Sequence, residues 1–176
     1  TGVQTCALPI STGDGLWLQW ALEITATQTL LFWDERDGGW FSTSGEDPSV
    51  LLRMKEDYDG AEPAAASVTV RNLLTLGHLV SDASLFARAQ RTLERYGPGL
   101  GQVARVMPLM LSNVAVWHGR APQVVIAGTP GAPDTAALEA VVAASTTPGL
   151  IQIPIGAAGA DASLASTLPW LAAMKA

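Results

Sequence analysis

The stretch from residue 52 to residue 80, LRMKEDYDGAEPAAASVTVRNLLTLGHLV, constrains the fold more than any other part of the chain. Its first half is an acidic loop with the sequence EDYDG at residues 56–60. Its second half has apolar residues at helical spacing, which predicts a helix from about Pro63 to Val80. Proline suits the first turn of a helix, because the backbone donor that it lacks has no partner there. The sequence therefore places an acidic, tyrosine-bearing loop directly before a helix.

A second helix is predicted over residues 15–33, with Asp14 as its N-cap. Its apolar positions are expected to form one wide buried stripe. The stripe consists of Leu18, Leu22, Leu30 and Trp33, with Trp17, Trp20, Ala21 and Ile24 beside them. Gly38-Gly39 then predicts a tight turn, because glycine adopts positive φ without strain, and residues 42–49 are expected to be loop.

Two more helices follow. One is predicted over residues 82–96 and is expected to end at Gly97-Pro98-Gly99, since glycine and proline interrupt helices. The other is predicted over residues 102–118, where Pro108 either kinks the helix or begins its regular part.

The periodicity changes after this point. Residues 123–127, QVVIA, and residues 150–155, LIQIPI, are apolar runs rich in β-branched side chains. Between them, Asp134 is expected to cap a helix of about ten residues. A strand, a helix and a strand at this spacing predict a βαβ unit with parallel, adjacent strands and a right-handed crossover.

Composition excludes several classes of protein. The chain has 176 residues, of which 48% are hydrophobic and 15% charged, which favours a packed core over disorder. The net charge is −6 with only ten basic residues, so no basic groove for nucleic acid is expected. No apolar run reaches the roughly 18 residues of a membrane span, so no membrane partner is expected and a cytoplasmic location is predicted.

The opening sequence, TGVQTCALPI, resembles a translated sequencing adaptor. Residues 1–10 are therefore expected to be a non-native segment, and the gene to be truncated. The single cysteine, Cys6, lies in this segment. One cysteine allows no internal disulfide and no CxxC pair.

Trp33-Asp34 is the first candidate for ligand binding, with Glu35, Trp40 and Phe41 nearby. Aromatic rings stack on sugar faces and carboxylates accept hydrogen bonds from hydroxyl groups, so the cluster is typical of a carbohydrate site. A solvated turn between buried aromatic residues explains the same sequence.

Tyr58, Asp59 and Glu62 form the second candidate, together with Glu56 and Asp57. Paired carboxylates could bind a ligand, act as acid and base, or hold a cation. The loop lacks the further ligands and closing glutamate of an EF-hand. Helix capping is the alternative, because acidic residues favour a helix N-terminus.

Neither a metal nor a cofactor is expected. His78 and His118 have no cysteine partner and no HxxxH spacing, which disfavours zinc. Residues 128–131, GTPG, follow a strand and precede a helix, but they fit no phosphate-binding motif. They are interpreted as a βα turn.

Three motifs carry a family resemblance. FWDERDGGWF, LLRMKEDYDGAEPAAASVTVRNLLTL and PQVVIAG, within residues 15–155, resemble the C-terminal region of a thioredoxin-domain-containing, spermatogenesis-associated-protein-like family. The resemblance implies an N-terminal thioredoxin-like domain fused to a six-hairpin, glycosidase-like α/α toroid. That toroid is similar to N-acylglucosamine epimerases.

The carry-over to individual residues is limited to one motif. The positions that match are Tyr58, Asp59, Gly60, Ala61, Pro63, Ser67 and Val68. Ala64-Ala65-Ala66 stands where the family usually has Ser-Gly-Asn, so a polar side chain beside the expected cavity is missing.

Together these observations predict a mainly α fold: a partial α/α toroid over residues 11–120 and a small βαβ tail over residues 121–176. The expected function is carbohydrate-related, as sugar binding or epimerase-like isomerisation. The expected contacts are Trp33, Asp34, Tyr58, Asp59 and Glu62. A non-catalytic scaffold for a thioredoxin-like domain is the alternative. This chain alone is expected to be inactive.

Overall fold

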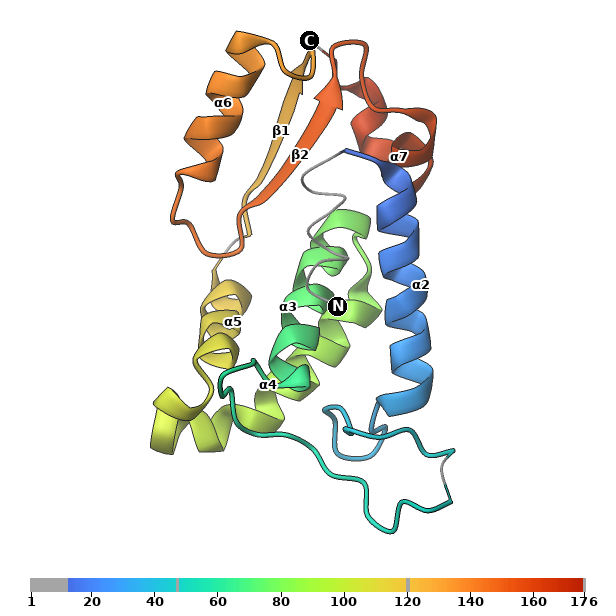
Figure 1. Cartoon of the computed structure of the whole chain (residues 1–176), viewed down its shortest axis with the longest axis vertical. Helices are drawn as coiled ribbons and strands as arrows, with labels where there is room; N and C mark the ends of the chain where they lie inside the picture. The colour runs from blue at the N-terminus through green and yellow to red at the C-terminus, as the bar shows by residue number, and fades with distance from the viewer. Residues whose placement is uncertain (1–12, 47, 120, 176) are drawn as a thin grey trace. The chain divides into compact units, whose positions relative to one another are not determined.

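The computed structural model describes residues 13–46, 48–119 and 121–175 of the chain (Figure 1). The fold is mainly helical, with a two-stranded parallel sheet. Two compact units are distinguished by their internal contacts. Among the described residues, the helical unit contains 22–119 and the α/β unit contains 13–21 with 121–175.

Helix α2 (Gly15–Phe32) confirms the helix predicted over residues 15–33. Asp14 caps it, because its carboxylate accepts a hydrogen bond from the Leu16 N–H at 2.9 Å. Leu18 and Ala21 are buried as expected. Leu30, which is expected in the same buried stripe, is 84% exposed. Thr25 is buried instead, so the buried face is narrower than the apolar composition of the helix suggests.

The predicted turn after α2 is present at Gly38-Gly39. Both glycines have positive φ, at 70° and 78°. The Asp34 N–H donates to the Gly39 carbonyl at 3.0 Å, and the Gly38 N–H donates to the Asp34 carbonyl at 3.0 Å. The chain therefore reverses tightly and pairs Trp33 with Trp40 in an antiparallel bridge.

Helix α3 (Ala65–Val80) begins later than predicted. Ala64 is the N-cap residue and has extended backbone geometry, so Pro63 precedes the helix and does not lie in its first turn. The Ala64 N–H donates to the Asp59 carboxylate at 2.8 Å, which holds this residue outside the helix. The apolar face of α3 is buried and includes Val70, Leu73, Leu74, Leu76 and Leu79.

Helix α4 (Ala83–Val103) continues through Gly97-Pro98-Gly99, where the sequence predicts an end. Tyr96 and Leu100 are buried on either side of Pro98, four residues apart on one face. Their packing holds the helix together across the position where Pro98 lacks an N–H. Tertiary contacts here override local propensity.

A 3₁₀ turn, η1 (Ala104–Val106), joins α4 to helix α5 (Pro108–His118). Pro108 is in the first turn of α5 and so begins the regular helix, which was one of the two predicted outcomes. Helix α3 packs against both α4 and α5, and the helical unit is built around it.

The α/β unit contains β1 (Gln123–Gly128), α6 (Pro133–Ala143) and β2 (Ile151–Gly156). The two strands pair in parallel, with Val125 opposite Ile153, which confirms the predicted βαβ pairing. Helix α6 contacts β1 in this unit (Figure 1). The chain continues through α7 (Ala162–Thr167) and η2 (Pro169–Ala173).

One local prediction in this unit is wrong. The N-cap of α6 is Ala132, and Asp134 lies inside the first turn. The Asp134 carboxylate accepts the Thr135 N–H at 2.8 Å. Pro133 takes the first helical position, where its missing donor costs nothing, and this moves the start of the helix before Asp134.

Candidate functional site

The best-defined charged pair of the helical unit joins Asp34 to Lys55. The Lys55 ammonium donates to the Asp34 carboxylate and to the Gly38 carbonyl, each at 2.6 Å. The two side chains are only 13% and 8% exposed. The glycine turn thus supplies a carbonyl acceptor and presents Asp34 to the same lysine.

Several hydrogen bonds stabilise the charge of Asp34. Its other carboxylate oxygen accepts the backbone N–H groups of Arg36 and Asp37, at 2.8 and 3.2 Å. Burial alone would raise the pKa of Asp34. The hydrogen bonds from Lys55, Asp37 and Arg36 outweigh that effect and lower the pKa from 3.8 to about 2. Asp34 is therefore ionised and already neutralised by a neighbour.

Trp33 is buried beside this pair. Its ring lies 5.0 Å from that of Trp40, and the Arg91 guanidinium lies 5.1 Å from its centroid. Arg91 also donates to the Glu35 carbonyl at 2.6 Å. These contacts enclose the indole, so Trp33 offers little surface for stacking on a sugar.

Asp59 connects two helices through its carboxylate. One oxygen accepts the Ala64 N–H before α3, at 2.8 Å. The other accepts the Leu109 and Met110 N–H groups in the first turn of α5, at 2.9 and 3.3 Å. This is the capping alternative, in a form that joins residues 50 apart in sequence.

Tyr58 and Glu62 flank Asp59 in the same loop and are exposed. Tyr58 is 63% exposed, and its ring covers Gly60 so closely that a Cβ there would lie 2.8 Å from a ring carbon. The Gly60 N–H donates to the Glu62 carbonyl at 3.0 Å. The structure thus brings Tyr58, Asp59 and Glu62 together on one loop and pairs Asp34 with a different partner.

Two hollows in the helical unit share Lys55 and Arg95. The first, of about 470 Å³, has a buried floor of Tyr96, Leu100 and Met107 and an exposed rim of Asp57, Arg95 and Gln102. The remaining lining residues are Lys55, Gly99, Val103 and Val106. An apolar floor with a polar rim is the usual composition of a small-ligand site.

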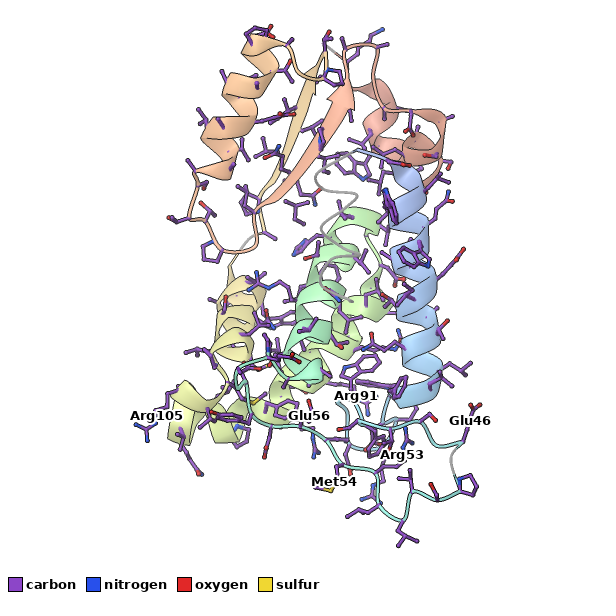
Figure 2. All side chains as sticks on the ribbon, in the orientation of Figure 1. Glu46, Arg53, Met54, Glu56, Arg91 and Arg105 are labelled. Atoms are coloured by element: carbon purple, nitrogen blue, oxygen red, sulfur yellow. The ribbon has the colours of Figure 1, made fainter. Side chains whose placement is uncertain are left out.

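The second hollow, of about 490 Å³, is lined by Asp34, Phe41 and several basic residues. Two of its lining residues, Arg53 and Met54, are labelled in Figure 2. Arg53 is held by hydrogen bonds to the carbonyls of Thr43 and Leu31, and its guanidinium lies 4.0 Å from the Phe41 centroid. Of the five predicted contacts, only Asp34 lines a hollow described here.

No motif or spacing in the sequence marks Lys55, Arg95 or Gln102 as site residues. Lys55 lies 21 residues from its partner Asp34, and Arg95 and Gln102 lie on a helix that was predicted to end at Gly97. Recognising that α4 continues to Val103 is what places Gln102 beside Arg95.

Neither histidine lines these hollows. His78 packs edge-on against Phe86, with ring centroids 4.9 Å apart, and partial burial lowers its pKa. Within the described ranges, no group of three or more histidine, cysteine or acidic side chains is arranged to hold a metal ion. No helix among the same residues is both long and apolar enough to cross a membrane.

Comparison with known proteins places the chain beside longer relatives. It is 34% identical over 163 residues to spermatogenesis-associated protein 20 of Mus musculus, which covers 92% of this chain and 20% of that relative. The Homo sapiens protein of the same name is 32% identical over 163 residues, and the Rattus norvegicus protein is 36% identical over 126 residues. No protein-family model matches the chain.

The chain spans about a fifth of the length of the curated relatives that it matches. The similarity nevertheless extends over most of its own residues, through both the helical and the α/β unit. These homologues support the assignment of the chain to the spermatogenesis-associated protein 20 family.

Proposed function

We propose that the helical unit contributes to a carbohydrate-binding α/α toroid and holds a sugar-sized ligand in the hollow between Lys55 and Met107. The observation that carries the proposal is the arrangement of an exposed polar rim over a buried apolar floor. Hydroxyl groups of a sugar would bond to Asp57, Arg95 and Gln102. The C–H face of the ring would lie on the floor.

The buried candidates, Trp33 and Asp59, do not contact the ligand in this arrangement. Trp33 is enclosed and the Asp59 carboxylate is engaged by three N–H groups. Asp34 would act indirectly, because it fixes Lys55 at the edge of the hollow. Tyr58 and Glu62 stay available at the surface as outer contacts.

A second function is favoured by the Asp59 contacts. The Asp59 carboxylate joins the start of α3 to α5, and helices held together in this way suit a non-catalytic scaffold that positions a thioredoxin-like domain of a longer protein. In this alternative, the hollow would bind no sugar.

One titration separates the two proposals. The chain would be titrated with N-acetylglucosamine and glucose at millimolar concentration and followed by nuclear magnetic resonance. Sugar binding predicts shifts at the amides of Gly99, Gln102 and Val103 that are lost in Gln102→Ala and Asp57→Asn. Glu94→Gln is the matched control, because Glu94 is an exposed residue on the same helix and does not line the hollow.

Unchanged spectra with both sugars would reject the carbohydrate proposal and leave the scaffold. Binding of a separately expressed thioredoxin-like domain from a relative, measured by calorimetry, would then test the scaffold directly. Catalysis is proposed only for the longer protein, where isomerisation would be assayed by exchange of the sugar proton with solvent deuterium.

A further inference from the structure

A hollow in the α/β unit is not explained by the function proposed above. It has a volume of about 440 Å³ and is lined by residues of β1, α6, β2 and the segment that leads into α7. Its strand residues are Ile126 and Gly128 of β1, and Pro154, Ile155 and Gly156 of β2. In parallel sheets, the carboxyl ends of the strands are where ligands bind, because the connecting loops diverge there.

The backbone at this hollow is built for close approach. A Cβ at Gly128 would lie 2.3 Å from the Thr135 hydroxyl oxygen, so only glycine fits between β1 and α6 at this point. Gly159 has φ of 109° and closes a turn by donating its N–H to the Gly156 carbonyl at 2.8 Å. These glycines set the shape of the hollow without side chains that would fill it.

The charges that line the hollow all have one sign. Glu139 of α6 and Asp161 before α7 are its two ionisable residues, and neither lysine nor arginine is among its lining residues. Asp134, five residues before Glu139 and inside the first turn of α6, adds a further carboxylate to the same helix. An anion is therefore disfavoured here, even though the hollow adjoins the start of a helix.

Apart from Thr135, the other side chains that line the hollow are apolar. Ile126 and Ile155 are buried, and Pro130 and Pro154 complete the wall. A ligand that fits must combine a short hydrocarbon body with a positively charged hydrogen-bond donor. A primary ammonium group supplies three donors and a unit charge.

We propose that this hollow binds small primary amines, with the ammonium group between Glu139 and Asp161 and the hydrocarbon part against Ile126 and Ile155. Asp161 already accepts the Leu164 N–H at 2.7 Å and the Ser163 hydroxyl at 2.8 Å, which fixes the carboxylate in place. The site is independent of the sugar hollow, because every residue that lines it belongs to the α/β unit.

The test uses three probes of matched size and different charge: n-pentylamine, 1-pentanol and pentanoate. Each is titrated into the whole chain at constant ionic strength, and amide shifts are followed at Gly128, Thr135 and Gly156. Pentylamine should bind at millimolar concentration, pentanol about fivefold more weakly because a neutral hydrogen bond replaces a charge-assisted one, and pentanoate not at all.

Two isosteric variants assign the ammonium position. Glu139→Gln and Asp161→Asn should each weaken pentylamine binding about fivefold and leave pentanol binding unchanged. Asparagine is as good an N-cap as aspartate, so α7 should remain folded in the second variant. Glu94→Gln in the helical unit is the control and should leave all three probes unaffected.

Equal binding of pentylamine and pentanoate would overturn the proposal, and so would pentylamine shifts confined to other residues. Absence of any shift at the three amides would overturn it as well. Full pentylamine affinity in the Glu139→Gln, Asp161→Asn double variant would show that the carboxylates do not recognise the amine.

Discussion

At the scale of single residues, two carboxylates of the helical unit have contrasting partners. Asp34 faces a lysine ammonium and two backbone donors, whereas Asp59 faces three backbone N–H groups. Both arrangements satisfy a partly or fully buried acid, but they fail differently when they are altered. The Asp34 arrangement depends on the positive charge of Lys55, whereas the Asp59 arrangement depends on having two acceptor oxygens for its three N–H donors.

Asp59→Asn should destabilise the chain almost as much as Asp59→Ala, by about 3 kcal/mol in the free energy of unfolding. Asparagine has the same shape, but its NH₂ group would face an N–H donor where the second carboxylate oxygen now accepts. Urea unfolding followed by circular dichroism measures the effect. Asp57→Asn is the matched control in the same loop and should change stability by less than about 0.5 kcal/mol.

Lys55→Met should cost about 3 kcal/mol, because it leaves the Asp34 charge without its counter-ion in a poorly solvated position. Arg36→Gln breaks the ion pair with Asp37, whose side chains are 88% and 46% exposed, and it should have almost no effect on stability. Thermal melts of both variants measure the difference. A similar loss for both variants would contradict the distinction drawn between the two pairs.

The pH dependence of stability should also report on Asp34. The folded-state pKa is about 2, below the ordinary value of 3.8, so the unfolded chain takes up the proton first as the pH falls. The contribution of Asp34 to stability is therefore complete above about pH 4 and is lost as the pH falls through about 2. Asp34→Asn should flatten the acid limb of a stability profile measured by urea titration between pH 2 and pH 6. An unchanged acid limb would show that other carboxylates control it.

At the scale of elements, α4 shows that packing can maintain a helix through residues that usually end one. Residues Gly97, Pro98 and Gly99 lie inside the helix, and nothing lies within 4 Å of a Cβ built at Gly99 or Gly101, chain neighbours aside. The sequence could predict the existence of every long helix from its apolar spacing. It could not predict that Tyr96 and Leu100 both pack and so keep the helix intact between them.

Gly99→Ala and Gly101→Ala should each stabilise the chain by about 0.5–1 kcal/mol, since alanine loses less backbone entropy in a helix and has room here. Gly77→Ala in α3 provides the contrast. Its Cβ would lie 3.1–3.2 Å from three carbons of the Phe86 ring, so it should destabilise by about 1 kcal/mol or more. Thermal melts of the three variants test whether space or helix propensity decides the sign.

The boundaries of α3 and α6 were less predictable than their existence. A proline and an acidic side chain lie near the start of each helix. Asp59 accepts the Ala64 N–H from five residues away in the sequence, before α3, whereas Asp134 accepts the N–H of the next residue, Thr135, in the first turn of α6. The candidate site met the same limit. Acidic residues could be identified from the sequence, but their partners, Lys55 and the N–H groups of α5, are 21 and 50 residues away.

At the scale of the whole molecule, two compact units each have their own buried residues. Asp59→Asn should therefore raise the hydrogen-exchange rates of amides in α3 and α5 while the amides of β1 and β2 keep their protection. Exchange measured by mass spectrometry on peptides from each unit checks this. Equal loss of protection in both units would show that they unfold as one cooperative body.

The contact between Asp59 and α5 also has a consequence for folding kinetics. Its hydrogen bonds close a loop of about fifty residues, and α3 and α4 both lie within that loop. Helices form from local contacts in microseconds or less, whereas closing a long loop is favourable in free energy only after the helices within it have packed. The carboxylate would then engage α5 after the rate-limiting barrier, so substitutions at Asp59 should accelerate unfolding and leave the refolding rate nearly unchanged. In a longer protein, the Asp59 side chain would therefore set the unfolding rate of the helical unit.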